Sequence, residues 1–131
     1  MIVYFSTKTG NTKRFVEKIK NTDSICIQPN LIINKPFVLF TATYAKNDGS
    51  GAVHPSVIKF LNNNKNKIIA VVGGGNRNFG EHFAYAADII SYKCNIPILH
   101  KFELFGNDED VEFIEYNMSK LFNNNNVMMH V

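Results

Sequence analysis

The chain has 131 residues, of which 45% are hydrophobic and 19% are charged. This balance excludes a disordered chain and supplies enough apolar side chains for one core, so we expect a single domain over residues 1–131. The longest apolar runs, residues 37–40 and 68–72, are much shorter than the roughly 20 residues that cross a bilayer, so no membrane association is expected. Residues 1–5 lack a basic leader and a cleavage site and are typical of a strand, which favours a cytoplasmic location.

The net charge is +3, and Lys and Arg are scattered along the chain rather than grouped in one block. A nucleic-acid-binding protein usually carries a dense basic patch, which this distribution does not indicate. It is still compatible with a modest basic face that binds an anionic ligand. Cys26 and Cys94 are far apart and form no CxxC motif, so they are interpreted as reduced core thiols. The four histidines form no HxH or HxxxH pair, which disfavours a protein-bound metal.

Taken in chain order, five short segments are typical of buried strands because they are apolar and rich in β-branched or aromatic residues. They are residues 2–5, a weaker segment at 24–28, 37–40, 68–72, and 98–99 with Phe102, Leu104 and Phe105 following. Apolar residues three and four positions apart predict a helix after the first, third, fourth and fifth strands. These sets are Phe15 and Ile19; Val57, Phe60 and Leu61; Phe83, Ala87 and Ile90; and Val111, Ile114, Met118, Leu121 and Phe122.

Single residues mark the ends of these elements. Pro55 suits the first turn of the second helix, and Asn107 or Asp108 can cap the last one. Pro36 and Pro97 suit the first residue of a strand. Asparagine runs at 62–64 and 123–126 fall where helices should end, and they are interpreted as solvated loop or tail.

Strands that alternate with helices predict an α/β fold, a doubly wound five-stranded parallel sheet with helices on both faces. One connection is irregular. Residues 29–35 are only seven positions, short of the dozen or more that a parallel crossover usually needs. We therefore expect the helix after the second strand to be absent or reduced to a turn.

The loop after the first strand combines hydroxyl residues with one glycine. Residues 6–12 have the sequence Ser-Thr-Lys-Thr-Gly-Asn-Thr and lead into a helix. Ligands of open α/β sheets bind at the carboxyl ends of the strands, where small residues let the backbone wrap an anion at a helix N-terminus. The loop therefore predicts a phosphate cradle, the alternative being a helix start capped by threonine. The Walker spacing GxxxxGK is absent, so ATP or GTP hydrolysis has no support.

Two further loops at neighbouring strand ends carry glycines and aromatic residues. Residues 41–51 contain Tyr44 and the Gly-Ser-Gly segment 49–51, and residues 73–80 begin with three glycines and contain Asn76 and Phe79. Asn78 stands where the dinucleotide fingerprint GxGxxG needs a glycine, so NAD is disfavoured. Either loop alone is compatible with an ordinary surface turn. With the phosphate cradle they predict a pocket for a phosphorylated flat heterocycle, most economically FMN.

Residues 7–12 resemble the flavodoxin FMN-phosphate motif Ser/Thr-x-Thr-Gly-x-Thr at every fixed place, which makes the expected fold flavodoxin-like. The chain also resembles the NrdI family, flavodoxin-like FMN proteins of class Ib ribonucleotide reductase systems. The matching segments are residues 5–15; 75–80 with Phe83, Ala86 and Ala87; and 96–104, which an ordinary flavodoxin has no reason to carry. The reduced helix and the charge of +3 also fit, since electron-carrier flavodoxins are usually strongly acidic.

The resemblance implies a single FMN-binding domain whose reduced flavin converts O₂ to a superoxide-type or peroxide-type oxidant. That oxidant would serve the assembly of the dimanganese-tyrosyl radical cofactor in the radical-generating β subunit of class Ib ribonucleotide reductase. The implied electron donor is a flavodoxin or a flavin reductase, and the chemistry would take place on FMN rather than on a catalytic side chain. The residues expected to bind the cofactor are Thr7, Lys8, Thr9, Gly10, Asn11, Thr12, Thr43, Tyr44, Ala45, Gly49, Ser50, Gly51, Gly74, Gly75, Asn76, Phe79 and Gly80.

The same residues bear on other functions. The runner-up is a general flavodoxin-type FMN electron carrier, which shares the phosphate loop. A cysteine phosphatase or arsenate reductase needs C-x5-R, but His100 and Ile32 occupy the arginine positions counted from Cys94 and Cys26. A receiver domain needs an acidic pair after the first strand, where the chain has a serine and a threonine. A flavin-free interaction module stays open on the sequence alone.

Overall fold

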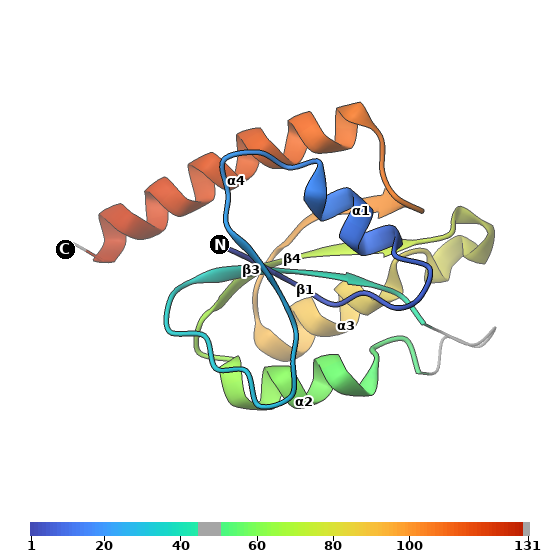
Figure 1. Cartoon of the computed structure of the whole chain (residues 1–131), viewed down its shortest axis with the longest axis horizontal. Coiled ribbons are helices and arrows are strands. Elements are labelled where there is room, and N and C mark those ends of the chain that lie inside the picture. Colours follow the sequence, from blue (N-terminus) through green and yellow to red (C-terminus); the bar gives the residue numbers. More distant parts are fainter. Residues whose placement is uncertain (45–50, 130–131) are drawn as a thin grey trace.

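The structure, a computed structural model, describes residues 1–44 and 51–129, without the side chains of Phe79, Glu81 and residues 124–129. Five strands alternate with helices along the chain (Figure 1). The elements are β1 (Ile2–Tyr4), α1 (Asn11–Glu17), β2 (Ser24–Cys26), β3 (Phe37–Ala42), α2 (Pro55–Asn64), β4 (Ile68–Gly75), the 3-10 helix η1 (Arg77–His82), α3 (Tyr85–Cys94), β5 (Ile98–Glu103) and α4 (Asp108–Met129).

The strands form one parallel sheet in the order β2-β1-β3-β4-β5. Helices α1 and α4 cover one face and α2 and α3 cover the other (Figure 1). Successive residues of a strand point to opposite faces, so Phe37 and Leu39 pack into the core under α2 and α3 while Val38 and Phe40 pack under α1 and α4. The expected doubly wound α/β fold is confirmed.

The end of β5 differs from the expected pattern. The apolar pattern places Leu104 and Phe105 with the fifth strand, but β5 ends at Glu103. The chain turns there because Leu104 takes a left-handed conformation with φ 55° and Gly106 follows with φ 72°. Leu104 and Phe105 are consequently exposed beyond the strand, with 48% and 43% of their surface accessible.

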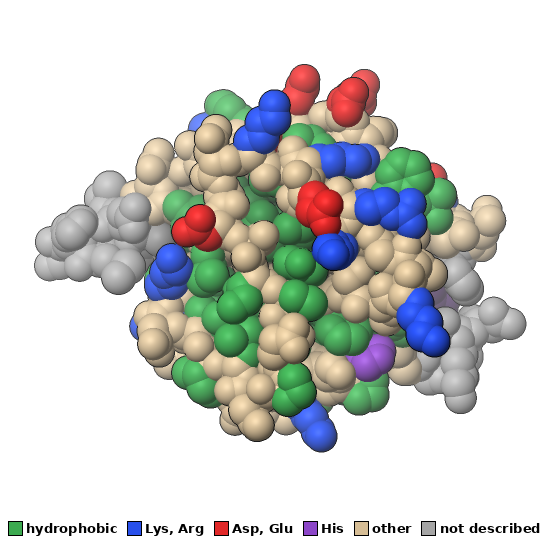
Figure 2. Space-filling view, in the orientation of Figure 1, with side chains coloured by type: hydrophobic (Ala, Val, Ile, Leu, Met, Phe, Trp, Pro, Cys, Tyr) green, Lys and Arg blue, Asp and Glu red, His purple; other side chains and the backbone are tan. Residues whose placement is uncertain are grey.

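The helix after β2 is absent from the described chain, as the short connection predicted. Residues 29–30 instead form a turn, and residues 31–36 continue without regular structure, held to the end of α2 by hydrogen bonds between Asn64 and the backbone of Leu31 and Ile33. A groove of about 810 Å³ lies beside this connection, between the β2 end and α2. On the face shown in Figure 2, hydrophobic side chains are visible across the middle of the surface.

Asn64 shows that the interpretation of residues 62–64 as solvated loop was wrong. The three asparagines form the last turn of α2, and Asn64 is only 1% exposed. Its side-chain oxygen accepts a hydrogen bond from Ile33 N at 2.8 Å, and its amide group donates to Leu31 O at 3.0 Å and Phe60 O at 2.8 Å. Without a helix in the β2–β3 connection, that backbone needs a partner from elsewhere, and Asn64 supplies it.

The interpretation of residues 123–126 as a loop or tail was also wrong, because α4 continues through them to Met129. Its start is well defined, since Asn107 Oδ1 accepts from Asp110 N and Asp110 Oδ2 accepts from Asn107 N, both at 2.9 Å. This reciprocal arrangement is a capping box, and it confirms Asn107 as the cap. Once a helix is nucleated and packed, each asparagine costs less than about 0.7 kcal/mol of helix propensity, too little to end it.

Candidate functional site

The strand order reverses between β1 and β3, and a cavity lies at the carboxyl ends of these strands and β4. In open parallel sheets this switch point is where ligands bind. The cavity measures about 270 Å³. It is lined by Ser6, Thr7, Thr9, Asn11, Thr12, Ala42, Thr43, Tyr44, Gly75, Asn76 and Leu104.

The first wall of the cavity is the loop between β1 and α1. Gly10 N donates to Thr7 O at 3.0 Å, and Gly10 has a left-handed φ of 68° that turns the chain into the helix. The N-cap residue of α1, Gly10, has no side chain to cap the helix, and in the first turn Ser6 Oγ accepts from Lys13 N at 3.4 Å. The helix start is therefore capped by Ser6 rather than by the hydroxyl of Thr7 or Thr9. The expected alternative, a helix start capped by threonine, is therefore not what the loop forms. Because α1 has only seven residues, hydroxyl and backbone donors would contribute more to anion binding than the helix dipole.

Arg14, on α1, holds this loop by a hydrogen bond. Its Nη2 donates to Thr9 O, and its guanidinium lies 5.6 Å from the ring centre of Phe105. The positive charge of Arg14 is therefore held next to the threonine loop. Sequence reasoning missed Arg14, although it lies just two positions beyond the motif.

The second wall is the end of β3. Thr43 Oγ1 accepts from Ala86 N at 3.1 Å, so the residue directly after β3 caps the start of α3, whose own N-cap residue, Ala84, provides no side-chain acceptor. Tyr44 lies edge-on to His54, with ring centres 5.2 Å apart. Burial raises the pKa of the Tyr44 phenol, and a hydrogen bond with Thr7 lowers it by a smaller amount. The phenol is therefore neutral near pH 7 and links this wall to the threonine loop.

The glycines at the end of β4 have packing reasons that the sequence did not reveal. A Cβ on Gly73 would lie 2.6 Å from Ala87 Cβ, and one on Gly74 would lie 2.6 Å from Phe102 Cζ. A Cβ on Gly75 would lie 2.7 Å from Ala84 N. The three glycines thus let α3 and Phe102 approach β4, and of the three the cavity lining includes Gly75.

The loop after β4 continues the third wall. Asn76 Oδ1 accepts from Asn78 N at 2.9 Å, which opens the 3-10 helix η1, and Gly80 interrupts that helix at φ 58°. Leu104, from the end of β5, lies on the same side of the cavity because its N donates to Gly75 O at 3.0 Å. Leu104 was missed as a site residue, since it was grouped with the fifth strand.

Eight of the residues expected from the sequence come together around the cavity: Thr7, Thr9, Asn11, Thr12, Thr43, Tyr44, Gly75 and Asn76. Among the described residues, Lys8, Gly10, Gly51, Gly74 and Gly80 do not contribute to the lining. Ala45, Gly49 and Ser50 lie outside the described residues, and the side chain of Phe79 is likewise not described. Ser6 and Ala42 line the cavity next to expected positions, so the edges of the motif loops were the available signal.

Within the described residues, no three His, Cys, Asp or Glu side chains gather in a way that could hold a metal ion. Cys26 and Cys94 are both free thiols, and burial raises the pKa of Cys94. No described helix is both long and apolar enough to cross a membrane.

Comparison with known proteins adds to this geometry. The family model described as NrdI Flavodoxin like matches residues 3–116. Protein NrdI of Ruegeria sp. (strain TM1040) is 44% identical over 115 residues, covering 84% of this chain and 81% of the relative. Protein NrdI of Bartonella tribocorum (strain CIP 105476 / IBS 506) is 41% identical over 128 residues, covering 93% and 96%.

Among solved structures, a short-chain flavodoxin associated with a non-canonical PDU bacterial microcompartment is similar in fold. Its TM-score is 0.63 at 19% identity, over 94% of this chain and 95% of that one. At this identity the likeness concerns the fold alone, and it confirms the flavodoxin-like architecture.

Proposed function

Because this chain belongs to the NrdI flavodoxin-like family, we propose that it holds FMN in the cavity at the ends of β1, β3 and β4. A flavin cofactor follows from the family and the fold, and the choice of FMN is the proposal. The observation that carries it is the presence of Thr7, Thr9, Asn11 and Thr12 in the cavity lining. Their loop has the form of a phosphate cradle, which a flavin without a phosphate would not use.

The chemistry of the lining fits FMN at both ends. Ser6, Thr7, Thr9 and Thr12 offer hydroxyls and Asn11 an amide, all suited to phosphate oxygens. The cavity of about 270 Å³ is slightly below the usual range for a small-molecule pocket. It would therefore take the phosphate and its chain, leaving the ring system at the open mouth.

The side chains at the mouth suit a flat aromatic ring system. Tyr44 offers an aromatic face and Leu104 an apolar surface. The remaining residues of the proposed binding set are Lys8, Gly10, Thr43, Ala45, Gly49, Ser50, Gly51, Gly74, Gly75, Asn76, Phe79 and Gly80. Ring stacking by Phe79 and loop contacts by residues 49–51 stay predictions from the sequence.

We further propose that the chain assists class Ib ribonucleotide reductase. When bound, FMN would supply the electrons that reduce O₂ to a superoxide-type or peroxide-type oxidant for the dimanganese-tyrosyl radical cofactor of the β subunit. A flavodoxin or a flavin reductase would return those electrons. No general acid or base is assigned among the side chains, whose part is to bind and orient the cofactor and to set its electrostatic surroundings.

The charge of the chain supports an oxygen-reducing role. Fully reduced flavin is an anion when its N1 is deprotonated, and a positive field favours the anionic form. The chain carries a net charge of +3, and Arg14 is held at the rim of the phosphate loop. An acidic electron carrier would oppose full reduction more strongly, so these charges favour a protein that delivers two electrons.

The first experiment tests the cofactor. The purified apoprotein is titrated with FMN and with riboflavin, which lacks the phosphate, and binding is followed by flavin fluorescence and visible absorption. We expect one FMN per chain and at least 100-fold weaker binding of riboflavin, since each hydrogen bond to a charged group contributes about 1.5–3 kcal/mol. Equal affinity for the two would remove the phosphate cradle from the site.

The second experiment tests the role. FMN-loaded protein is reduced with dithionite, freed of excess reductant and mixed with the Mn(II)-loaded β subunit, then oxygen is admitted and the tyrosyl radical is counted by electron paramagnetic resonance. Free reduced FMN, and the two proteins separated by a dialysis membrane, are the controls, and both should give little radical. No radical in the complete mixture, with efficient electron delivery to an unrelated reductase, would favour the general flavodoxin-type carrier.

A further inference from the structure

The end of β5 holds the loop after β4 at three backbone positions. Leu104 N donates to Gly75 O at 3.0 Å, and Lys101 Nζ donates to Phe83 O at 3.3 Å while pairing with a carboxylate of α3. Between them, Glu103 Oε2 accepts from Arg77 N at 3.0 Å. The loop from 75 to 83 is thus fixed at its start, its middle and its end by one strand.

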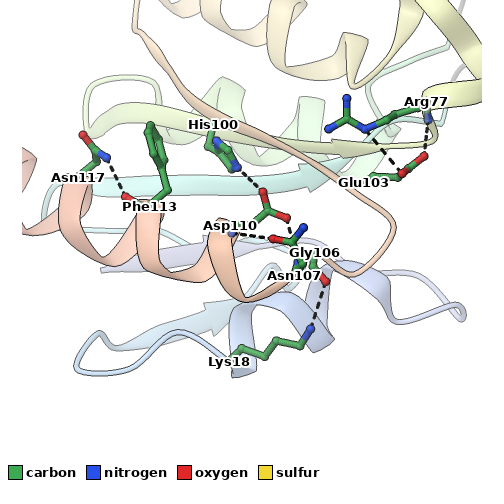
Figure 3. A network of polar contacts seen from close by, with 9 residues as sticks. All are labelled: Lys18, Arg77, His100, Glu103, Gly106, Asn107, Asp110, Phe113 and Asn117. Atoms are coloured by element: carbon green, nitrogen blue, oxygen red, sulfur yellow. Dashed lines mark hydrogen bonds and ion pairs between the residues drawn. The ribbon is translucent and has the colours of Figure 1, made fainter.

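Glu103 makes a second contact with the same residue. Its Oε1 lies 3.6 Å from Arg77 Nε, so one carboxylate faces both the backbone N–H and the guanidinium of Arg77 (Figure 3). The Arg77 guanidinium also lies 4.8 Å from the ring centre of Phe83. Arg77 is therefore held in one place by a carboxylate on one side and an aromatic ring on the other.

The magnitudes indicate which contact matters for the loop. The side chains of Arg77 and Glu103 are 66% and 39% exposed, and a surface ion pair of this kind contributes little to stability. A hydrogen bond from a backbone N–H to a carboxylate is stronger because it is charge-assisted and fixes the backbone directly. The Arg77 N–H bond is therefore the contact that sets the path of the loop.

This contact lies directly behind the cavity wall. Gly75 and Asn76, the two residues before Arg77, line the cavity, and so does Leu104, the residue after Glu103. Gly75 and Glu103 are also partners in the β4–β5 register. A shift of the loop at Arg77 would move Asn76 first, and with it the wall that faces the proposed cofactor.

From this geometry we infer that Glu103 is a positioning residue for the cofactor pocket. It fixes the wall at Asn76 through the Arg77 N–H and balances the charge of the Arg77 guanidinium beside the pocket. The inference rests on the proposed function, since the ligand it concerns is FMN. It assigns a role to a residue of β5 that need not touch the cofactor.

Three variants separate the two parts of this role. Glu103→Ala removes both contacts, whereas Glu103→Gln keeps an oxygen that can accept from Arg77 N and removes the negative charge. Glu17→Ala is the matched control, because it removes a glutamate from an exposed pair, Lys13 Nζ to Glu17 Oε1 at 3.9 Å, on the outer surface of α1. All three are compared with the wild type by circular dichroism to establish that they fold.

Three measurements are made on each protein. Amide exchange of Arg77 in the apoprotein, followed by NMR, reports on the loop without any flavin. We expect exchange at least tenfold faster in Glu103→Ala than in the wild type and Glu17→Ala.

FMN binding should weaken about tenfold or more in Glu103→Ala and less than threefold in Glu103→Gln. The midpoint potential of bound FMN should move to more positive values in Glu103→Gln, because the uncompensated Arg77 charge favours the reduced anion.

Wild-type Arg77 exchange and FMN affinity in Glu103→Ala would overturn the inference while leaving the proposed function intact. An unchanged potential in Glu103→Gln would overturn the charge-balancing part, and this test holds even if Glu103→Ala fails to fold. If the wild type itself binds no FMN, the proposed function fails, whereas faster Arg77 exchange in Glu103→Ala would still support the hold on the loop.

Discussion

Replacing Asn64 with alanine removes the side chain that takes the place of a helix in the β2–β3 connection. Asn64 is 1% exposed and joins the last turn of α2 to the backbone of residues 31 and 33. The Ile33 N–H is buried and has Asn64 Oδ1 as its acceptor at 2.8 Å. The variant would therefore leave polar backbone groups without their protein partner.

The cost follows from the groups left behind. An unsatisfied buried N–H or C=O costs about 1–3 kcal/mol, and two such groups, Ile33 N–H and Leu31 O, lose Asn64. Phe60 O, the third partner, is the helical carbonyl four residues earlier, which can also pair with the backbone N–H of residue 64, so it adds little. With some relief from water entering the vacated space, we expect a loss of about 2–4 kcal/mol, a large share of a typical domain stability of about 5–15 kcal/mol.

Urea unfolding of the apoproteins measures this loss, because a bound cofactor would raise the apparent stability. With a slope of about 2 kcal/mol per molar urea, the midpoint of Asn64→Ala should fall by roughly 1–2 M. Asn63→Ala is the matched control, since it changes the same residue type one position earlier on the exposed side of α2 and should be neutral or slightly stabilising. Equal midpoints for the two variants would refute the view that Asn64 replaces the helix.

The variant Asn64→Asp tests the same buried position through the pH dependence of its stability. An ionised carboxylate keeps the acceptor for Ile33 N but faces two carbonyl oxygens, Leu31 O and Phe60 O, with no donor. The folded state therefore favours the protonated acid and raises its pKa above the usual value of about 3.9. Because the folded state then binds the proton more tightly than the unfolded state, the stability of this variant should be highest at low pH and fall as pH rises from about 4 towards the raised pKa. A flat profile relative to the wild type would contradict the buried placement.

Three further variants test the site and its surroundings. Thr9→Ala combined with Asn11→Ala should weaken FMN binding by at least 100-fold, as titration would show, while leaving the fold intact by circular dichroism; retained affinity would remove these residues from the cradle. Tyr44→Leu should weaken FMN binding several-fold and shift the visible spectrum of the flavin, and an identical spectrum with normal binding would exclude Tyr44 from the ring site. Gly106→Ala should destabilise the apoprotein by about 2–4 kcal/mol in thermal unfolding, because Gly106 has φ 72° and its Cβ would lie 2.5 Å from Phe15 Cδ1; an unchanged melting temperature would show that the helix and loop adjust freely.

The sequence alone determined the architecture because the burial of a strand or helix is visible in the pattern of apolar residues within that segment. Each strand buried on both faces appears as a short apolar run, and each α-helix appears as an apolar stripe of three- and four-residue spacing, whereas the 3-10 helix η1 lies in residues that the sequence pattern indicates as a loop. The threonine loop is equally local, because its residues from Thr7 to Thr12 are adjacent in the chain. The length of the β2–β3 connection also predicted that no full helix follows β2, since seven residues leave little room for one.

The tertiary structure decided which polar groups meet across long separations. Asn64 looked like solvated loop, yet it pairs with a backbone 31 residues away, and Arg77 pairs with Glu103 26 residues away. The glycines at the end of β4 were interpreted as letting the backbone approach a ligand, but they also make room for Phe102 and α3. Local patterns report how much of a segment is buried, whereas the partner of a buried polar group depends on which segments the fold brings together. Whether a polar group finds a hydrogen-bond partner is therefore a property of the assembled chain. The roles of Asn64 and Glu103 depend on such partners, and the periodicity of the sequence does not predict them.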